Sequence, residues 1–232
     1  MRRNWRSLGR FGASGPRRSN RPWSITDRNG LATIHGYARL MDDAQLPAAF
    51  VPYLQGIREE TEALRQVVTN FLNFAKPAEL TLTPVSLRAL ADRAADEIRS
   101  EVSARGGEVR VTGEFGTVDG DEVLLRQALS NLCRNALEAC ADAGIAPNIE
   151  VAGVIDGAHA TQQITVSDNG PGVSPAVSDR MFRPFFTTKA RGTGLGLALV
   201  QKIVVTHNGR IAVARAEHGG ARFTLSLPLK RA

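Results

Sequence analysis

Apolar positions recur at helical spacing in the first third of the chain. They follow 3-4-3 spacing over residues 31–44 and an almost unbroken 3-4 heptad over residues 53–75. Pro47 and Pro52 separate the two stretches, so the pattern predicts two helices joined by a turn. Each helix has only a narrow apolar stripe, so we expect the hairpin to dimerise into a four-helix bundle. The alternative is a hairpin packed against its own C-terminal region.

The pattern changes after Pro77, where "KPAEL" is typical of a hinge to a second domain. Asp121 is a candidate N-cap for a helix that runs to about residue 141. A long loop is expected over 173–191. Further helices are expected over 86–104 and 194–207, and strands over 80–87, 108–113, 148–155, 162–168, 210–217 and 221–229. This order predicts an α+β fold, in which three helices cover a mixed sheet.

Positive charge is concentrated at the N-terminus. The net charge is +6, yet residues 1–30 alone carry eight Arg and one Asp, so the rest of the chain is nearly balanced. We expect residues 1–27 to form a basic, disordered tail. Such a tail can bind nucleic acid or a membrane surface, but the balanced body argues against a specific nucleic-acid partner. No apolar run approaches the ~20 residues of a membrane span, and no signal peptide is evident. We expect a cytoplasmic chain, whose parent protein could be membrane-anchored.

Cys133 and Cys140 are the only two cysteines. On one helix they would lie about 10.5 Å apart along the axis, which is too far for a disulfide. Both fall on an apolar stripe, so we expect buried free thiols in a reducing compartment.

The stretch "NLCRNALEAC" places Asn131, Asn135 and Glu138 on one helix face, away from the apolar stripe. Carbonyl and carboxylate oxygens suit a hard cation such as Mg²⁺. A solvated polar face is the plain alternative.

Two glycine-rich segments lie further along the chain. In "ITVSDNGPGV", Asp168 ends an alternating strand, and Gly170 and Gly172 follow it. A carboxylate above a glycine turn can accept a hydrogen bond from an exocyclic amine, although Asn-Gly and Pro-Gly also form ordinary turns. In "RGTGLGLALV" the glycines precede a helix, which favours phosphate binding at the helix N-terminus. Neither a P-loop nor a dinucleotide fingerprint fits this segment.

The loop between these segments, "MFRPFFTTKA", combines aromatic residues with one lysine. Phe182, Phe185 and Phe186 could anchor a lid while Lys189 reaches a phosphate. The alternative is a loop whose aromatic residues complete the core.

The order and spacing of these motifs resemble the ATP-binding catalytic domain of two-component sensor histidine kinases, within the superfamily that includes gyrase, Hsp90 and MutL. Residues 131–139 are similar to the N box, 168–172 to the G1 box, 182–189 to the F box and 192–200 to the G2 box. The resemblance covers about residues 80–229. It implies a Bergerat-type α/β sandwich over residues 80–232 that uses ATP and Mg²⁺, with a response regulator as partner.

The resemblance also implies roles for single residues. Asp168 would contact the adenine amino group, and Thr224 would support the adenine through water. Asn135 would bind Mg²⁺, with Asn131 and Glu138 assisting. Lys189 would hold the phosphates. Lys189 and Asn131 would also take part in the transfer of the γ-phosphoryl group. The glycine segments would supply close backbone contacts, from Gly170, Gly172, Gly192, Gly194, Leu195, Gly196 and Leu197.

Asn131 stands where the hydrolytic branches of the superfamily have a Glu. Because an amide cannot act as a general base, phosphoryl transfer to a protein side chain is favoured over ATP hydrolysis. A catalytically incomplete ATP-binding module and a serine kinase of the anti-sigma type stay open as alternatives.

The hairpin, residues 28–76, resembles the dimerisation and phosphoacceptor helices of the same family. Aligning Asn29 and Gly30 with that motif puts the acceptor histidine at position 25, where the chain has Ile25, followed by Thr26 in place of an acid. We therefore expect residues 1–27 to be foreign to the family. The resemblance implies a homodimer, and a partner kinase could supply the acceptor in trans. His35 lies about 80° around the helix and about 15 Å along it from position 25. We therefore expect a partly buried structural histidine rather than a substitute acceptor.

Overall fold

The computed structural model describes residues 25–75, 80–189, 192–217 and 219–229. The chain divides into two compact units, one up to Arg65 and the other from Gln66 onward. Of the tail expected over residues 1–27, residues 1–24 lie outside the described residues, and residues 25–27 are helical rather than disordered. The hinge at 76–79 also lies outside the described residues. The domain boundaries drawn from the sequence therefore stay predictions.

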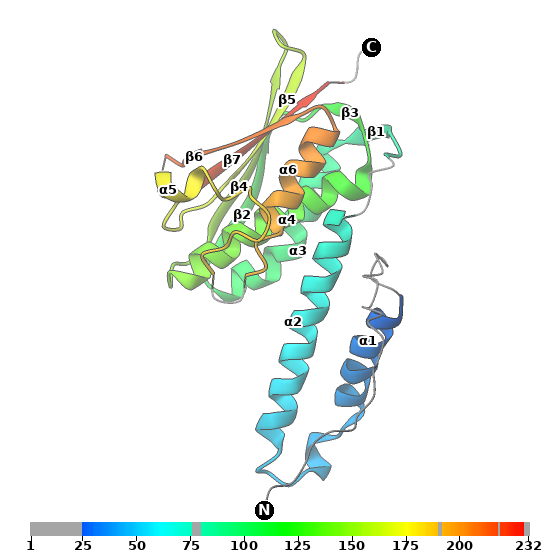
Figure 1. Ribbon diagram of the computed structural model, residues 1–232. Coiled ribbons are helices and arrows are strands. Elements are labelled where there is room, and N and C mark those ends of the chain that lie inside the picture. The colour runs from blue at the N-terminus through cyan, green and yellow to red at the C-terminus, as the bar shows by residue number, and fades with distance from the viewer. Residues whose placement is uncertain (1–24, 76–79, 190–191, 218, 230–232) are drawn as a thin grey trace, which may run out of the picture. The chain divides into compact units, whose positions relative to one another are not determined.

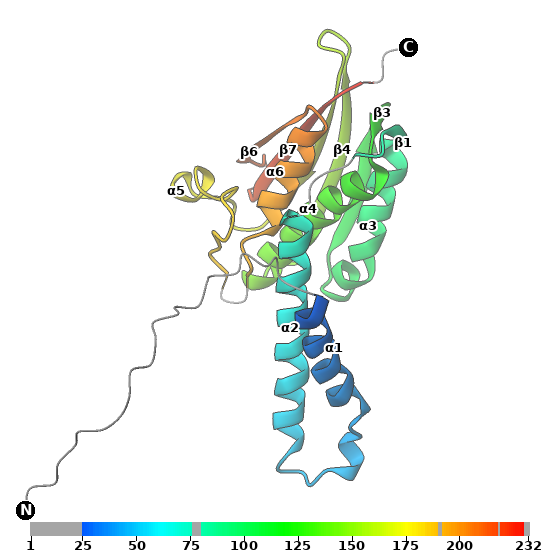
Figure 2. The ribbon, with the colours of Figure 1, turned by 45° about the vertical axis from the view of Figure 1, so that its right-hand side comes forward.

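The first unit is a helical hairpin, seen in blue and cyan in Figure 2. It consists of α1 (Ile25–Leu40), a short 3-10 helix (Asp43–Gln45) and the first part of α2 (Val51–Ala75). Helix α1 begins earlier than the expected residue 31. Helix α2 includes Pro52, because a proline in the first turn of a helix lacks only an N–H that would have no helical partner.

One arginine joins the two helices of the hairpin. Arg58 of α2 donates from Nε to the carbonyl of Ala38, at 2.8 Å, and from Nη2 to that of Met41, at 2.6 Å. These carbonyls belong to the C-terminal end of α1, where helical partners are missing. Ala38, Leu54 and Thr61 are buried. Other apolar side chains of the hairpin are exposed, among them Ile34, Tyr37, Leu40, Met41, Tyr53, Ile57 and Leu64.

The second unit is an α/β sandwich (Figure 1). Its five-stranded sheet has the order β2 (Glu108–Gly113), β4 (Asn148–Asp156), β5 (Thr161–Ser167), β7 (Ala221–Pro228), β6 (Arg210–Arg215). Strands β2 and β4 are parallel, and all other neighbours are antiparallel. A separate pair joins β1 (Thr83–Ser86) to β3 (Thr117–Gly120). The mixed sheet confirms the α+β prediction, whereas the short strand β3 was not predicted.

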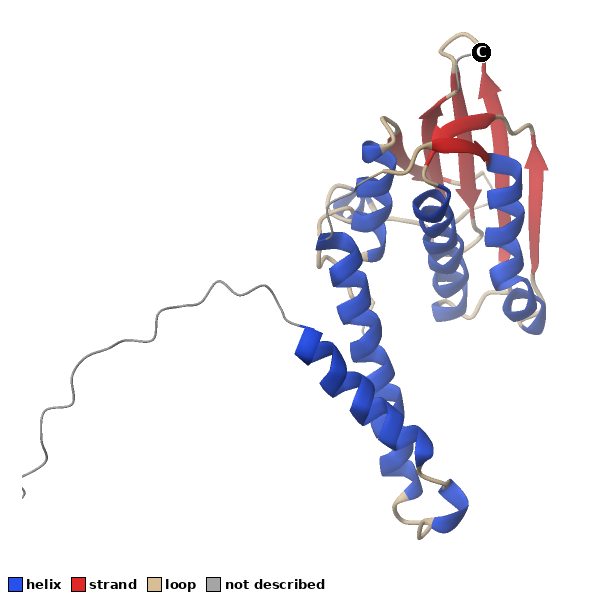
Figure 3. Ribbon diagram, turned by 90° about the vertical axis from the view of Figure 1, so that its right-hand side faces the viewer, coloured by secondary structure: helices blue, strands red, loops and turns tan. Residues whose placement is uncertain are grey.

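Three helices, α3 (Leu87–Ala104), α4 (Glu122–Asp142) and α6 (Gly196–Thr206), cover the sheet, as the view in Figure 3 shows for helices and strands. Burial alternates along β5 and β7, which assigns one side of each strand to the core beneath the helices. The fourth helix, α5 (Pro175–Ser178), is a single turn within the expected 173–191 loop. None of the helices in the described part of the chain is both long and apolar enough to cross a membrane.

Caps fix the ends of α4 and α6 relative to each other. Asp121 is the N-cap of α4, and its side chain accepts a hydrogen bond from the N–H of Leu124 at 3.1 Å. The N–H of Asp121 donates to Nε2 of the buried His207, at 2.9 Å, and His207 Nδ1 lies 2.8 Å from the Ile203 carbonyl. The predicted cap is confirmed, and the C-terminal end of α6 is held at the N-terminal end of α4.

Candidate functional site

Asp168 directly follows β5 and is buried, with 6% of its surface exposed. Its Oδ1 accepts hydrogen bonds from the main-chain N–H groups of Gly170, at 2.9 Å, and Ala221, at 3.1 Å. No described residue donates to Oδ2. Burial raises the pKa of this carboxyl, and the two main-chain donors oppose that rise. One oxygen is thus fixed by the fold, and the other is left for a ligand.

Glycines surround this carboxylate because there is no room for a side chain. A Cβ on Gly220 would lie 2.0 Å from the Asp168 carbonyl oxygen and 2.5 Å from Oδ1. A Cβ on Gly172 would lie 2.9 Å from the Gly220 carbonyl oxygen. Both glycines have positive φ angles, +74° and +79°. Gly170 and Gly172 were predicted from the sequence, whereas Gly220 and Ala221 were not. Finding them requires the pairing of β5 with β7, which sets Asp168 beside Ala221.

Asn169 fastens the Asp168 loop to the end of α4. Its Oδ1 accepts from the N–H of Asn148 at 2.8 Å and from Cys140 Sγ at 3.3 Å, and its Nδ2 donates to the Ala146 carbonyl at 3.0 Å. Both the oxygen and the nitrogen of the side-chain amide therefore have structural partners. It holds the carboxylate loop against the helix that carries the three polar candidates.

Those three candidates, Asn131, Asn135 and Glu138, lie on α4 and are half-buried. The opposite side of α4 is in the core, with Leu125, Leu129, Leu132, Ala136 and Cys140 buried as predicted. Cys133 and Cys140 are both free and buried, which confirms the expected thiols. Burial raises the pKa of Cys133 to about 12.

Lys189 reaches the same face of α4 from the loop before α6. Its Nζ lies 2.5 Å from Glu138 Oε2. Its backbone is held in a turn, because its N–H donates to Thr187 Oγ1 at 3.1 Å and its carbonyl accepts from the N–H of Gly192 at 3.1 Å. The structure thus brings together a cation from one predicted motif and a carboxylate from another.

The glycine segment before α6 is packed tightly at one end and open at the other. A Cβ on Gly194 would lie 2.4 Å from the Phe185 carbonyl carbon, and the N–H of Phe185 donates to the Gly194 carbonyl at 3.0 Å. Gly194 has a φ of +65°, which delays the start of α6 from the predicted residue 194 to Gly196. A Cβ on Gly196 meets nothing within 4 Å. No side chain caps α6, so its first N–H groups suit an anion.

The aromatic residues of the preceding loop have two different environments. Phe182 and Phe186 pack against the core, and the Arg180 guanidinium lies 4.7 Å from the Phe186 ring centroid. Phe185 is 63% exposed and has a φ of +65°, which is strained for a residue with a side chain. Two of the three rings therefore complete the core, as one sequence interpretation expects, and the lid interpretation stays a prediction.

The structure does not bring Thr224 to Asp168. Thr224 pairs with Thr165 of β5, and its neighbours Phe223 and Leu225 point into the core beneath the helices. Alternation puts Thr224 on the other face of the sheet, whereas the buried Asp168 is on the core side. The expected support of adenine by Thr224 has no basis in this geometry, and Ala221 is the β7 residue next to the carboxylate.

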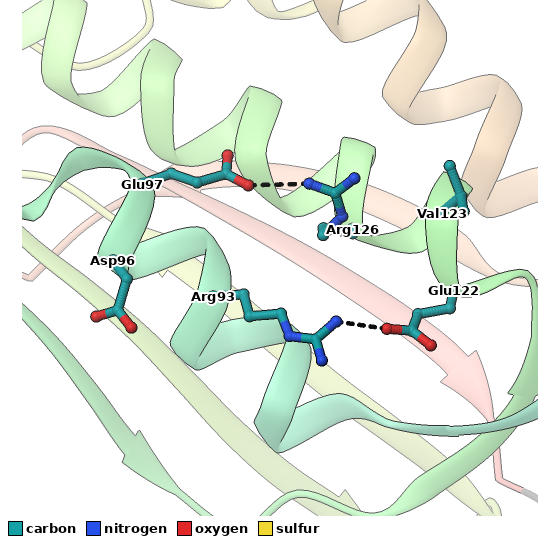
Figure 4. Close-up of a pocket in the computed structure, with 6 residues that line it drawn as sticks. All are labelled: Arg93, Asp96, Glu97, Glu122, Val123 and Arg126. Carbon is teal, nitrogen blue, oxygen red and sulfur yellow. Dashed lines mark hydrogen bonds and ion pairs between the residues drawn. The ribbon is translucent and has the colours of Figure 1, made fainter.

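A hollow of about 580 Å³ lies elsewhere, between α3 and α4, and contains none of the predicted site residues. Its charges are paired with each other, Arg93 with Glu122 at 2.6 Å and Arg126 with Glu97 at 3.2 Å (Figure 4). Because these groups already have opposite partners, the hollow gives no argument for a charged ligand.

His35 lies on α1 with 21% of its side chain exposed. Its Nδ1 is 3.4 Å from Thr61 Oγ1, and its Nε2 is 3.8 Å from Glu62 Oε2. These neighbours belong to α2, so His35 connects the two helices of the hairpin, as expected for a partly buried structural histidine.

Known proteins with similar sequences indicate the family to which the second unit belongs. Residues 120–231 match the family described as histidine kinase-, DNA gyrase B- and HSP90-like ATPase. The chain is 34% identical over 208 residues to the signal transduction histidine-protein kinase AtoS of Escherichia coli K12. The second unit is a sensor histidine kinase catalytic domain. The aligned part covers 87% of this chain but only 33% of AtoS.

Two further proteins are similar to this kinase domain, one in sequence and one in structure. The sensor histidine kinase ZraS of Escherichia coli O157:H7 is 36% identical over 206 residues, which cover 87% of this chain and 44% of ZraS. The full-length ShkA crystal structure in complex with AMPPNP has a TM-score of 0.76 at 28% identity, and it covers 89% of this chain and 44% of ShkA. The chain thus spans less than half the length of the relatives it matches.

Proposed function

We propose that this kinase domain binds ATP with Mg²⁺ and transfers the γ-phosphoryl group to a histidine side chain in two-component signalling. The observation that carries the proposal is the Asp168 carboxylate. Its Oδ1 is fixed by Gly170 and Ala221, and its Oδ2 has no partner among the described residues. An adenine amino group can donate to Oδ2, and guanine, with a carbonyl at that position, cannot.

The polar face of α4 fits the metal. Asn135, with Asn131 and Glu138, offers amide and carboxylate oxygens, which are the ligands that Mg²⁺ prefers. Within the described residues, no three or more His, Cys, Asp or Glu side chains are placed to hold a metal ion by themselves, so the proposed site depends on the amide oxygens of α4. When bound, the ion would neutralise charge on the phosphates.

The phosphates would lie between Lys189 and the start of α6. Main-chain N–H groups of Gly194, Gly196 and Leu197 would donate to them, aided by the positive end of the helix dipole. The N–H groups of Gly192 and Leu195 already donate to the Lys189 carbonyl and to Thr193 Oγ1, so they are the weaker candidates. Gly196 leaves open space for close approach.

Phosphoryl transfer then needs mainly positioning. The bond from the γ-phosphorus to the bridging oxygen breaks, an N–P bond forms on the imidazole, ADP leaves, and the imidazole proton goes to a base. Asn131 cannot activate water, which supports transfer over hydrolysis.

The acceptor is proposed to lie on another chain, because position 25 is Ile25. The exposed apolar side chains of the hairpin support pairing with a second hairpin, in a homodimer or with a partner kinase. Only a partner kinase would bring the acceptor, because both chains of a homodimer have Ile25. Because the proposed reaction belongs to two-component signalling, a response regulator is the proposed next partner in the relay. The absence of the acceptor also favours a second candidate function, an ATP-binding module that docks partners without transferring phosphate.

An acceptor can be restored to separate the two candidates. The chain with Ile25→His, Thr26→Glu and Asn135→Ala would have an acceptor but no metal-binding amide. Mixed with the native chain and γ-labelled ATP, it should gain acid-labile label, whereas neither chain alone should. Acid-labile label on the native chain alone that His35→Ala removes would show that His35 is used instead. Acid-stable label would indicate a serine kinase. If no chain is labelled in any mixture, the second candidate function, an ATP-binding module without phosphate transfer, would be favoured.

A further inference from the structure

The ion pair between Glu138 and Lys189 joins two groups that the proposed function assigns to different parts of the ligand. Glu138 belongs to the metal face of α4, and Lys189 to the phosphate side. The carboxylate and the ammonium lie 2.5 Å apart and neutralise each other. Neither has another ionic partner among the residues that the structure describes.

This pair is exposed enough to separate. The side chains of Lys189 and Glu138 keep 32% and 46% of their surface in solvent. Ion pairs at such sites contribute little to stability, so the fold does not depend on it. The Lys189 backbone is anchored independently by Thr187 and Gly192, so the side chain can change partners while the turn stays in place.

A bound triphosphate would compete for Lys189 because it carries more negative charge than one carboxylate. Glu138 would then face the phosphates without a counter-charge, and like charges at close range repel each other. A divalent cation beside Glu138 removes that repulsion. Asn135 lies one helical turn before Glu138 on the same face and supplies a neutral oxygen for the same ion.

We propose that Glu138 makes nucleotide binding dependent on metal, by exchanging Lys189 for the cation when the metal-loaded nucleotide enters. Glu138 is thus a specificity-determining residue that discriminates against metal-free nucleotide. This inference rests on the proposed function, since it presupposes a nucleotide site on α4.

The test compares dissociation constants of ATP measured by calorimetry with Mg²⁺ and with EDTA. Glu138→Gln should bind metal-free ATP about tenfold more tightly than the native chain, because a repulsive charge is removed and Lys189 is released for the phosphates. The increase in ATP affinity that Mg²⁺ produces should be correspondingly smaller in this variant. Glu122→Gln is the matched control, because it breaks an exposed α4 ion pair, to Arg93, and should change neither constant.

Lys189→Met is the second variant and keeps the proposal testable should Glu138→Gln not fold. It leaves Glu138 unpaired, so metal-free ATP should bind more weakly than to the native chain. The increase in ATP affinity that Mg²⁺ produces should therefore be larger. An unchanged ratio of the two constants in either folded variant would overturn the exchange. No ATP binding by the native chain under either condition would instead overturn the proposed function itself.

Discussion

The main-chain N–H of Ala221 lies 3.1 Å from Asp168 Oδ1 and donates a hydrogen bond to it. The first residue of β7 thereby fixes the carboxylate that ends β5. Asp168→Asn can keep its oxygen in this position, which turns its NH₂ group toward the ligand. An NH₂ group there faces the adenine amine donor to donor, so ATP binding should weaken about 10–100-fold.

The measurement for Asp168→Asn is a pair of titrations with ATP and GTP, in which the preference for adenine should fall. Asp156→Asn is the matched control. Asp156 also accepts main-chain hydrogen bonds, from Ala158 and His159 in the β4–β5 turn, but it is not among the site residues. Unchanged adenine preference in Asp168→Asn would contradict the assigned role.

The raised pKa of Asp168 predicts how stability changes with pH. The folded chain holds the proton to higher pH than the unfolded chain, because burial penalises the charged carboxylate. Between the ordinary aspartate pKa and the raised one, the folded state binds more protons, so this group makes the protein less stable as the pH rises. Below the ordinary pKa the penalty is absent.

Asp168→Asn cannot ionise at this position. The free energy of unfolding of the native chain, measured by urea titration at several pH values, should therefore fall relative to that of Asp168→Asn as the pH rises through this window. A difference that stays constant with pH would show that burial does not penalise the Asp168 charge.

Gly219 and Gly220 provide a matched pair of adjacent glycines. Both have positive φ angles, +88° for Gly219 and +74° for Gly220. A Cβ added to Gly219 meets nothing within 4 Å, whereas a Cβ added to Gly220 would lie 2.0 Å from the Asp168 carbonyl oxygen. Gly219→Ala should cost about 1 kcal/mol from backbone conformation alone. Gly220→Ala should cost roughly 3 kcal/mol or more, because backbone atoms must move as well.

Urea unfolding measures both costs, and ATP titration shows whether Asp168 has moved. We expect weakened binding in Gly220→Ala only. Equal stability and equal binding in the two variants would mean that the contact between Gly220 and Asp168 is not constrained.

The cysteines should be unreactive in the folded protein. Cys133 and Cys140 are buried, and burial raises the pKa of both thiols, that of Cys133 to about 12. Because the thiolate is the reactive form, iodoacetamide should label neither at neutral pH without denaturant, and both in urea. Mass spectrometry of the labelled chain checks this. Rapid native labelling of Cys140 would show that the contact of α4 with Asn169 opens.

The apolar pattern and the order of motifs were sufficient to predict the mixed sheet and its three covering helices, whereas the roles of the candidate residues stay predictions. Asp121 illustrates why, because an N-cap acts through residues three positions away and is therefore readable from the sequence. Strand β3 was missed because its four residues, Thr117–Gly120, are too few to show a clear periodicity, and because they pair with β1, which lies before α3 in the chain.

The remaining site geometry depends on contacts between distant segments. The register of β5 and β7 decides that Ala221, and not Thr224, lies beside Asp168. The pairing of Glu138 with Lys189 joins residues 51 positions apart through an irregular loop. No local pattern encodes either contact, so neither was predictable from one sequence.

The central claim is that Asp168, the α4 polar face and the start of α6 form one nucleotide site. Isothermal titration calorimetry of the purified chain with Mg²⁺ and a non-hydrolysable ATP analogue tests it most directly. The account predicts saturable heat from a single class of sites, with a dissociation constant of roughly 1 µM to 1 mM, and a clearly weaker signal for Asp168→Asn. No heat from a chain whose circular dichroism shows it to be folded would contradict the claim.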